Sequence, residues 1–376
     1  MSRKFKIKLV LLVLGWTGIL LAAGLAAPKF ISQTSYIGSR NHLDERLPKW
    51  LYDGRMPRWI WMWASLDGNH YLSIARDGYY ELEYGFFPLY PVLIRFLNSL
   101  TGLQFAISGL VISYLSLLGI MVMGWKLLRL DYSADRSKSI LYWLLVFPTA
   151  FFLISVYNDS LYLFLALTSW YLVRKKKILS GATVGYFAAL TRITGLALLP
   201  ALAVEAIMSR RKVKELFPLI LIPLGTLSYF LYLEVFRGGW SLFFDSMAIW
   251  SQQRFVFPLQ TLWRYLKIIL GFQTLDRAYL VASMELSVVI LSILLLVKGW
   301  KSVRLSYLVY AIVVLLLPSS SGTLAGMPRY FLHAFPLIII LSSLFKHRWL
   351  IISFRLVFFV TRLVLFAYFS QGHFVS

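Results

Sequence analysis

The sequence predicts an all-α integral membrane protein, a single domain over residues 1–376 that crosses the bilayer about 11 times as a helical bundle. Three observations support this fold class. Hydrophobic residues make up 59% of the chain and charged residues only 14%, whereas a soluble domain has about 25% charged residues. Apolar stretches that approach the about 20 residues of a spanning helix recur along the chain. Basic residues gather in the polar segments between them.

The expected elements follow in chain order. The first span is expected at 9–27, where the apolar run is longer than the about 7–15 residues of a signal-peptide core, so we expect it to be retained. Residues 28–87 form a long polar outer loop. The apolar segment 86–100 is too short to span and should be interfacial or re-entrant. Further spans are expected at 104–127, 139–156, 158–173, 178–191, 193–208, 216–236, 278–297, 305–318, 330–345 and 349–369.

The net charge of +22 is first a signal of topology, because Lys and Arg concentrate in the cytoplasmic loops of membrane proteins. The basic runs all fall inside if 178–208 is a hairpin and 86–100 does not cross. Most carboxylates then lie outside, with the two long loops 28–87 and 237–277. Chemistry is therefore expected on the non-cytoplasmic face, and the charge indicates no nucleic-acid partner. A sharper interpretation adds that some arginines outside the basic runs bind phosphate.

Composition and motifs exclude several classes of protein. A cytosolic enzyme, a disordered chain and a secreted disulfide scaffold do not fit the apolar content, and the absence of cysteine excludes thiolate chemistry. The chain has no Walker A sequence, no Gly-rich dinucleotide fingerprint and no H-E-x-x-H motif. We therefore expect neither a metal nor a cofactor.

The densest cluster of polar residues lies at 66–80. In a helix, Asp67, His70 and Tyr71 would share one face, because residues three and four apart are neighbours. A carboxylate beside an imidazole at a membrane surface is a plausible general base. The alternative is that Asp67 only caps a helix in a wet loop. Gly78 is expected to end the helix.

Other candidates lie at the expected outer ends of spans. Asp159 is either a helix cap or part of a site. Arg192 interrupts an apolar hairpin, where an arginine is usually functional, although it can also extend to the interface. Arg329 can hold a phosphate through two N–H groups or simply anchor a span. The two prolines within 86–91 indicate either a kinked entry into the membrane or a wall of an outer cavity.

Several of these residues belong to motifs in which the chain resembles PIG-V-type mannosyltransferases, a family that includes GPI mannosyltransferase 2. The first block is D-G-N-H-Y-L-x-I-A-x-x-G-Y at 67–79, followed by F-F-P-x-x-P at 86–91. The next motifs are Y-N-D-S at 157–160, R-x-x-G at 192–195 and P-R-Y at 328–330. They occur in the order that the family shows.

The resemblance implies a GT-C-like bundle and an inverting glycosyltransferase on the non-cytoplasmic face. Such an enzyme moves a hexose, here mannose, from a polyprenyl- or dolichyl-phosphate donor to a lipid-linked or cell-surface glycan. It also implies that Asp67 is the catalytic base. The residues expected to bind substrates are His70, Tyr71, Asp77, Asp159, Arg192, Arg329 and Tyr330.

The physical chemistry agrees, because the acceptor hydroxyl must lose a proton and the departing phosphate gains charge. The expected partners are the lipid donor, the glycan acceptor and the bilayer, and no protein partner is indicated. A prokaryotic plasma membrane is favoured, or the endoplasmic reticulum in a eukaryote.

The competing class is a lipid transporter or flippase, which would place its polar residues near the membrane midplane. A structural assembly protein is a third, weaker alternative. The enzyme hypothesis requires Asp67 and Arg329 to face one outer cavity.

Overall fold

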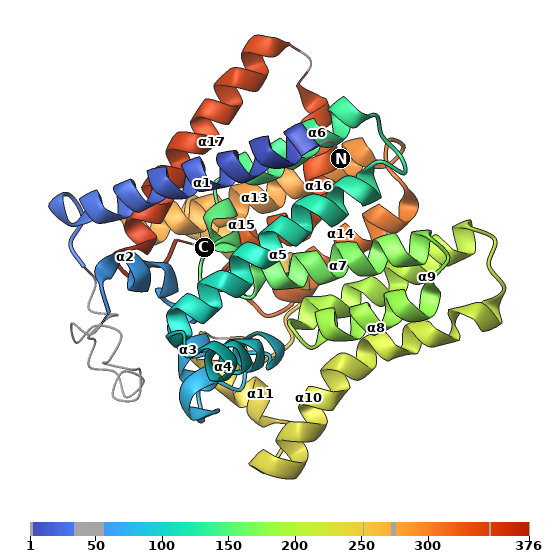
Figure 1. Cartoon of the computed structure of the whole chain (residues 1–376), viewed down its shortest axis with the longest axis horizontal. Helices are drawn as coiled ribbons and strands as arrows, with labels where there is room; N and C mark the ends of the chain where they lie inside the picture. The colour runs from blue at the N-terminus through green and yellow to red at the C-terminus, as the bar shows by residue number, and fades with distance from the viewer. Residues whose placement is uncertain (1–2, 34–55, 251, 272–275, 346, 376) are drawn as a thin grey trace.

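The computed structural model describes residues 3–33, 56–250, 252–271, 276–345 and 347–375, and within these ranges every regular element is a helix (Figure 1). The all-α expectation is therefore confirmed for the described part of the chain. Residues 34–55, which belong to the expected outer loop 28–87, lie outside it.

The first four helices are α1 (Arg3–Ala26), α2 (Arg58–Trp61), α3 (Asp67–Asp77) and α4 (Leu89–Thr101). As predicted, Gly78 ends α3, with a φ of 85° that an L-residue rarely adopts. Helix α4 has only 13 residues. One of its sides packs on α3 and α5, while its other side exposes Val92 and Phe96. This short amphipathic helix fits the interfacial position expected for 86–100.

The next helices form a closely packed layer: α5 (Phe105–Leu128), α6 (Ala134–Val146), α7 (Asp159–Arg174), α8 (Ile178–Ala189), α9 (Leu198–Met208) and α10 (Leu221–Arg237). Helix α8 packs against both α7 and α10. A Cβ atom on Gly225 of α10 would lie 2.1 Å from the carbonyl oxygen of Tyr186 on α8. Small residues of this kind allow helices in a membrane to approach closely.

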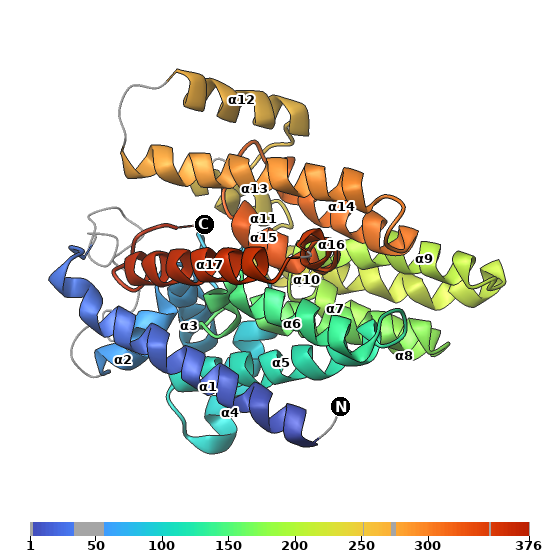
Figure 2. The ribbon, with the colours of Figure 1, turned by 90° about the horizontal axis from the view of Figure 1, so that it is seen from above.

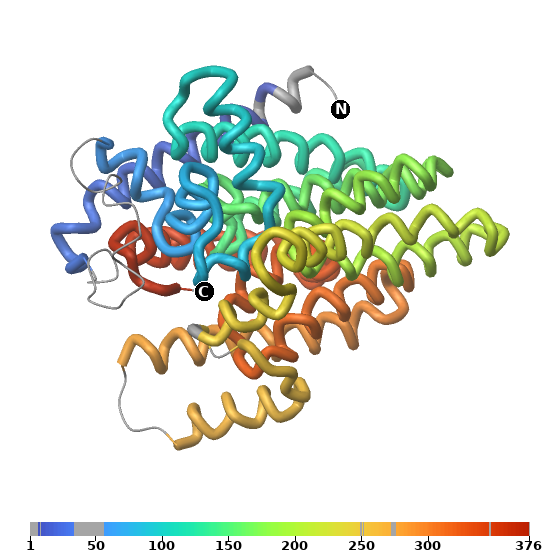
Figure 3. Tube along the Cα trace, turned by 90° about the horizontal axis from the view of Figure 1, so that it is seen from below, coloured from blue at the N-terminus to red at the C-terminus, as the bar shows by residue number. Residues whose placement is uncertain are grey.

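The C-terminal part comprises α11 (Leu242–Ser246), α12 (Pro258–Leu270), α13 (Arg277–Gly299), α14 (Leu305–Ser319), α15 (Met327–His333), α16 (Phe335–Leu344) and α17 (Arg348–Phe369). Figure 2 shows α12 on the outside of the molecule, and it packs on α13. Helix α17 returns to pack beside α1, so the first and last helices are neighbours. Seen from the opposite side, α4 and α12 lie at opposite edges (Figure 3).

Five helices in the described ranges are long and apolar enough to cross a membrane, or six if the pair α15 and α16 forms one span. These five are 9–29, 105–128, 213–237, 277–299 and 348–369. A membrane protein is therefore supported, but the expected count of about 11 spans is not. Three further apolar helices, 178–189, 193–208 and 305–319, are shorter.

Two expected spans are not continuous helices, and a proline accounts for each. The expectation at 139–156 is wrong as a single helix, because α6 ends at Val146 and a separate short 3₁₀ turn follows at Ala150–Leu153. Pro148 disfavours the helical conformation of the residue before it. The expected span 330–345 is bent by 89° between α15 and α16, and Pro336 lies at the start of α16. Both breaks shape the site described below.

A partly buried ionic cluster connects the helix ends that carry the basic runs. Arg174, the last residue of α7, contacts Asp131 at 2.7 Å and Glu205 at 3.2 Å. Arg304 contacts Glu205 at 2.8 Å. The cluster joins the C-terminal ends of α7 and α9 to the start of α14, in agreement with the expectation that their basic runs lie on one side. The first residue of α7, Asp159, is at the other end of the helix.

Candidate active site

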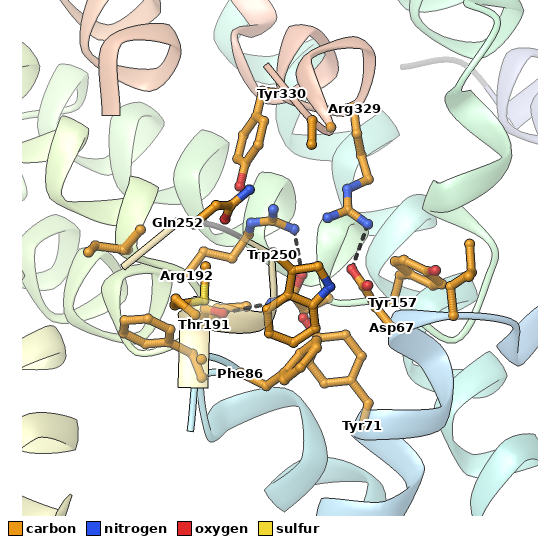
Figure 4. Close-up of a pocket in the computed structure, with 18 of the residues that line it drawn as sticks. Asp67, Tyr71, Phe86, Tyr157, Thr191, Arg192, Trp250, Gln252, Arg329 and Tyr330 are labelled. Carbon is orange, nitrogen blue, oxygen red and sulfur yellow. Dashed lines mark hydrogen bonds and ion pairs between the residues drawn. The ribbon is translucent and has the colours of Figure 1, made fainter. Parts of the chain in front are cut away.

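A pocket of about 160 Å³ opens at the end of the bundle opposite to this ionic cluster. Its walls come from segments that are distant in sequence: 66–71, 85–87, 157–158, 191–193, 243–250 and 325–330, with Gln252 and Phe374. Figure 4 shows Arg192 and Arg329 extending toward its centre, with Asp67 below Arg329. The pocket therefore brings together Asp67 and Arg329, as the enzyme hypothesis requires.

Hydrogen bonds from the interrupted segment after α6 hold the elements that present these side chains. Thr149 donates to the carbonyl oxygen of Pro328 at 2.8 Å, which fixes the start of α15. Tyr157 donates to the carbonyl oxygen of Ser65 at 2.8 Å, just before α3 begins. Leu66 adopts a φ of 60°, so the chain turns sharply into α3. The break near Pro148 thus positions both sides of the pocket.

Arg329 is the central cation of the site. Its Nη1 donates to Oδ2 of Asp67 at 2.8 Å, and its Nε lies 3.7 Å from Oδ1 of Asp159. Its guanidinium lies over the rings of Phe152 and Tyr157, each at 5.3 Å from the ring centroid. Arg329 is thus largely enclosed by protein, which argues against a simple interfacial anchor.

Arg192 approaches from the connection between α8 and the 3₁₀ helix η6 (Ile193–Ala197). Its Nη1 donates to Oδ1 of Asn158 at 2.8 Å and lies 3.3 Å from Oδ1 of Asp159. The guanidinium lies 5.1 Å from the centroid of the Tyr330 ring. These contacts hold Arg192 within the protein rather than extended to a lipid interface.

Asp159 lies beneath the pocket and is fully buried. Three basic groups lie close to the same carboxylate oxygen, Oδ1: Arg192 at 3.3 Å, Arg329 at 3.7 Å and Nε2 of His333 at 2.8 Å. Asp159 makes no side-chain cap on α7, since the helix begins after Asn158. It therefore acts as the counter-charge that holds both arginines.

Asp67 is the more open of the two carboxylates. Its side chain is 28% exposed and pairs with Arg329. It is the first residue of α3 and makes no capping hydrogen bond, which contradicts the helix-cap alternative. One turn later, Tyr71 also lines the pocket. Burial raises the pKa of Tyr71 well above its usual range, so its hydroxyl stays protonated and can donate a hydrogen bond.

His70 and Asp77 do not line this pocket. His70 is buried one layer behind it, where its Nδ1 lies 3.3 Å from Oε1 of Glu83 and its ring stacks on Phe86 at 4.7 Å. Burial raises the pKa of Glu83, and the hydrogen bond from His70 opposes that shift. Asp77 lies at the far end of α3 with a largely exposed side chain. Of the three residues expected to share one face of α3, Asp67 and Tyr71 line the pocket, whereas His70 does not.

The F-F-P block forms part of the wall. Phe86 and Phe87 line the pocket, and Tyr79 donates to the carbonyl oxygen of Phe86 at 2.6 Å. The ring of Trp250 packs edge-on against that of Phe86, with 5.8 Å between the ring centroids, so a segment distant in sequence covers the F-F-P block. The wall interpretation of the 86–91 motif is therefore favoured over a kinked entry alone.

Sequence reasoning missed several residues of the site, among them one that contacts Asp159 from below and others that line the pocket. His333 follows Arg329 by four positions, so helical spacing alone places it on the same face. Trp250, Gln252 and Phe374 line the pocket, but they belong to no motif. Their positions depend on the packing of distant segments, which the sequence does not display.

The arrangement combines one accessible carboxylate with two guanidinium groups in a pocket with aromatic walls. Guanidinium groups bind phosphates through paired N–H donors. A carboxylate within reach of a hydroxyl can accept its proton. Among the described residues, no group of three or more His, Asp or Glu side chains is arranged to hold a metal ion. The site is suited to transfer chemistry on an anionic substrate.

Comparison with known proteins identifies a family. The model of the Mannosyltransferase (PIG-V) family matches residues 32–226, just over half of the chain. The matched region includes Asp67, Asp159 and Arg192, whereas Arg329 lies beyond it. No curated protein matches the chain.

Proposed function

Because the chain belongs to the PIG-V mannosyltransferase family, we propose that it transfers mannose from a polyprenyl- or dolichyl-phosphate donor to a lipid-linked or cell-surface glycan. We place this reaction on the non-cytoplasmic face of the membrane. One observation carries the proposal: Asp67, Arg192 and Arg329 line the same pocket. A transfer from a lipid phosphate needs a proton acceptor and a cation at the leaving group, and these residues supply both.

In the proposed reaction, the acceptor hydroxyl oxygen attacks C1 of mannose from the face opposite the phosphate. The bond between C1 and the phosphate oxygen breaks, its electron pair stays on that oxygen, and the lipid phosphate leaves. The hydroxyl proton passes to the carboxylate of Asp67. Attack from the opposite face inverts the anomeric centre.

The leaving phosphate gains negative charge as the bond breaks, so donors that face it lower the barrier. We assign this role to Arg329 and Arg192, with the hydroxyl groups of Tyr71 and Tyr330 as further donors. Asp159 holds the two arginines at the pocket floor. Since His70 does not line the pocket, its proposed role is to support Phe86.

Aromatic side chains form much of the remaining wall. Phe86, Tyr157 and Trp250 line the pocket together with the charged residues. The C–H faces of a hexose pack well on such rings, which carry a large apolar surface. We propose that these rings hold the sugar while the arginines hold the phosphate. The lipid tail then remains in the bilayer.

We further propose that about 11 spans surround this site, with the basic runs on the cytoplasmic side. Helices shorter than a full span are included in that number. A prokaryotic plasma membrane is the favoured location, and the endoplasmic reticulum is the eukaryotic equivalent.

The alternative function is a lipid or glycolipid flippase without transferase activity. The observation that favours it is the 89° bend between α15 and α16, since transporters build binding sites from broken helices. The two functions differ in their product. A flippase leaves the bond between C1 and phosphate intact, whereas a transferase breaks it.

The test uses the purified full-length chain in proteoliposomes with polyprenyl phosphate carrying labelled mannose and an extract of membrane glycolipids as acceptors. We expect label to move to an acceptor lipid. In Asp67→Asn, which keeps the size and loses the proton acceptor, transfer should fall about 10²–10⁴-fold. Asp245→Asn is the matched control, because Asp245 is exposed and outside the pocket. Label that crosses the bilayer while still attached to its donor would contradict the proposal.

A further inference from the structure

The charged side chains of the pocket pair with one another. Asp67 holds Arg329 at 2.8 Å, and Asp159 lies 3.3 Å from Arg192 and 3.7 Å from Arg329. Two carboxylates therefore face two guanidinium groups. An anionic donor cannot bind Arg329 fully unless it competes with a carboxylate that is already there.

The two carboxylates differ in how easily they can yield. Asp159 is fully buried, with two guanidinium groups and the imidazole of His333 close to its Oδ1, so moving it away would leave buried charges unpaired. Asp67 is 28% exposed on the pocket side, and Arg329 is its ion-pair partner within the described residues. An ion pair that opens to solvent on one side is easier to break than one that is fully buried. Asp67 is thus the carboxylate that a phosphate can replace.

Arg329 itself is held in place from behind. The carboxylate of Asp159 and the rings of Phe152 and Tyr157 contact its guanidinium on the sides that Asp67 does not occupy. When Asp67 leaves, these contacts remain. The guanidinium can therefore present the same Nη1 to a new anion at the pocket side.

Resting on the proposed function, we propose that the donor phosphate displaces Asp67 from Arg329, and that this exchange frees the carboxylate to take the acceptor proton. The free enzyme then holds its base in an ion pair. The base becomes available when the leaving group is already bound, so the donor binds before the acceptor is activated. The ion pair between Asp67 and Arg329 acts as a substrate-operated switch.

The switch has a consequence that a purely catalytic base lacks. Since Asp67 competes with the phosphate for Arg329, removal of its charge should improve donor binding while it lowers the rate of transfer. The competing pair is partly exposed, so we expect Asp67→Asn to bind polyprenyl phosphate about threefold to tenfold more tightly. A carboxylate that only positions Arg329 would give weaker binding in this variant.

The experiment measures the binding of polyprenyl phosphate, which has the phosphate and lipid but no sugar, to the purified full-length protein in detergent micelles. The variants are Asp67→Asn, Arg329→Gln and the double variant, with Asp245→Asn as the control for general charge. We expect tighter binding in Asp67→Asn, weaker binding in Arg329→Gln and unchanged binding in the control. The gain from Asp67→Asn should vanish in the Arg329→Gln background.

Each arm can overturn the proposal. Unchanged or weaker binding in Asp67→Asn refutes it, and this arm needs no Arg329 variant to fold. An equal gain with and without Arg329 would mean simple repulsion between Asp67 and the phosphate, not an exchange. If the wild type transfers mannose and Asp67→Asn does not, yet its affinity is unchanged, the switch fails and the proposed function stands. If the wild type transfers no mannose and binds no polyprenyl phosphate, both fail.

Discussion

Replacing Asp159 with Asn tests whether the pocket floor is held by charge. Asparagine keeps the size of the side chain but removes its negative charge. Asp159 lies 3.3 Å from Arg192 and 3.7 Å from Arg329, so without its charge Asp67 would be the one carboxylate left beside the two arginines among the described residues. Breaking a buried ion pair by removing one partner costs about 3–5 kcal/mol. We expect Asp159→Asn to lower the free energy of unfolding by about that amount.

The matched comparison is Asp67→Asn, the same chemical change at a carboxylate that is 28% exposed. An ion pair that opens to solvent on one side contributes less than a fully buried pair, so we expect this variant to lose about 1 kcal/mol. Both can be measured by reversible denaturant titration in micelles, followed by the fluorescence of the 13 tryptophans. The two losses should differ by at least about threefold.

A double variant tests whether the loss of stability in Asp159→Asn comes from the missing charge. Combining Asp159→Asn with Arg192→Gln removes one of the unpaired cations, so the double variant should lose less stability than the sum of the single variants. Two results would refute this reasoning: Asp159→Asn as stable as Asp67→Asn, or single losses that simply add. In either case the buried carboxylate would not be what holds the two arginines at the pocket floor.

Three further predictions address topology, packing and pH. The chain has no native cysteine, so single cysteines can be placed at the exposed positions Ser241 and Ser209. In intact cells an impermeant thiol reagent should label the cysteine at 241, which we expect outside, and not the one at 209, which we expect inside. Equal labelling of both would contradict the topology. Arg362→Gln should lower the free energy of unfolding by about 1–3 kcal/mol in the same titration, because Arg362 donates a hydrogen bond to the carbonyl oxygen of Leu145 at the end of α6. An unchanged unfolding midpoint would show that this hydrogen bond does not stabilise the fold. Burial raises the pKa of Glu83 above its usual 4.5, so its contribution to stability is full below pH 4.5 and is lost as the pH rises through the raised pKa. In Glu83→Gln the free energy of unfolding should therefore fall less with rising pH than in the wild type. The same pH dependence in both proteins would contradict this prediction.

The sequence predicted the helices well, because apolar runs must be buried in lipid or protein and their lengths are visible. It predicted less well where those helices break. Pro148 and Pro336 both stand in the sequence, yet each lies within a segment expected to be one span. A proline within an apolar run is compatible with a kinked span or with a break. The choice depends on which neighbour satisfies the freed backbone groups, as Arg362 does at the end of α6.

The site could be predicted where a polar side chain stands out against an apolar background. Asp67, Arg192 and Arg329 were found in this way, and they meet in one pocket. His70 shows the limit of helical spacing, which gives a shared side of α3 but not which neighbour takes each residue. Trp250 belongs to no motif and does not stand out from the residues around it, and its place beside Phe86 follows from tertiary packing.

Helix α7 carries a charged contact at each end. Asp159, its first residue, belongs to the pocket floor, and Arg174, its last, belongs to the ionic cluster with Asp131 and Glu205. The helix is thus a spacer of fixed length, about 22 Å between these residues. Insertion of one residue would shift one end by about 1.5 Å and rotate it by about 100°, so that one of the two networks would lose its partner. Insertions and deletions that the connecting loops tolerate should therefore be excluded from α7.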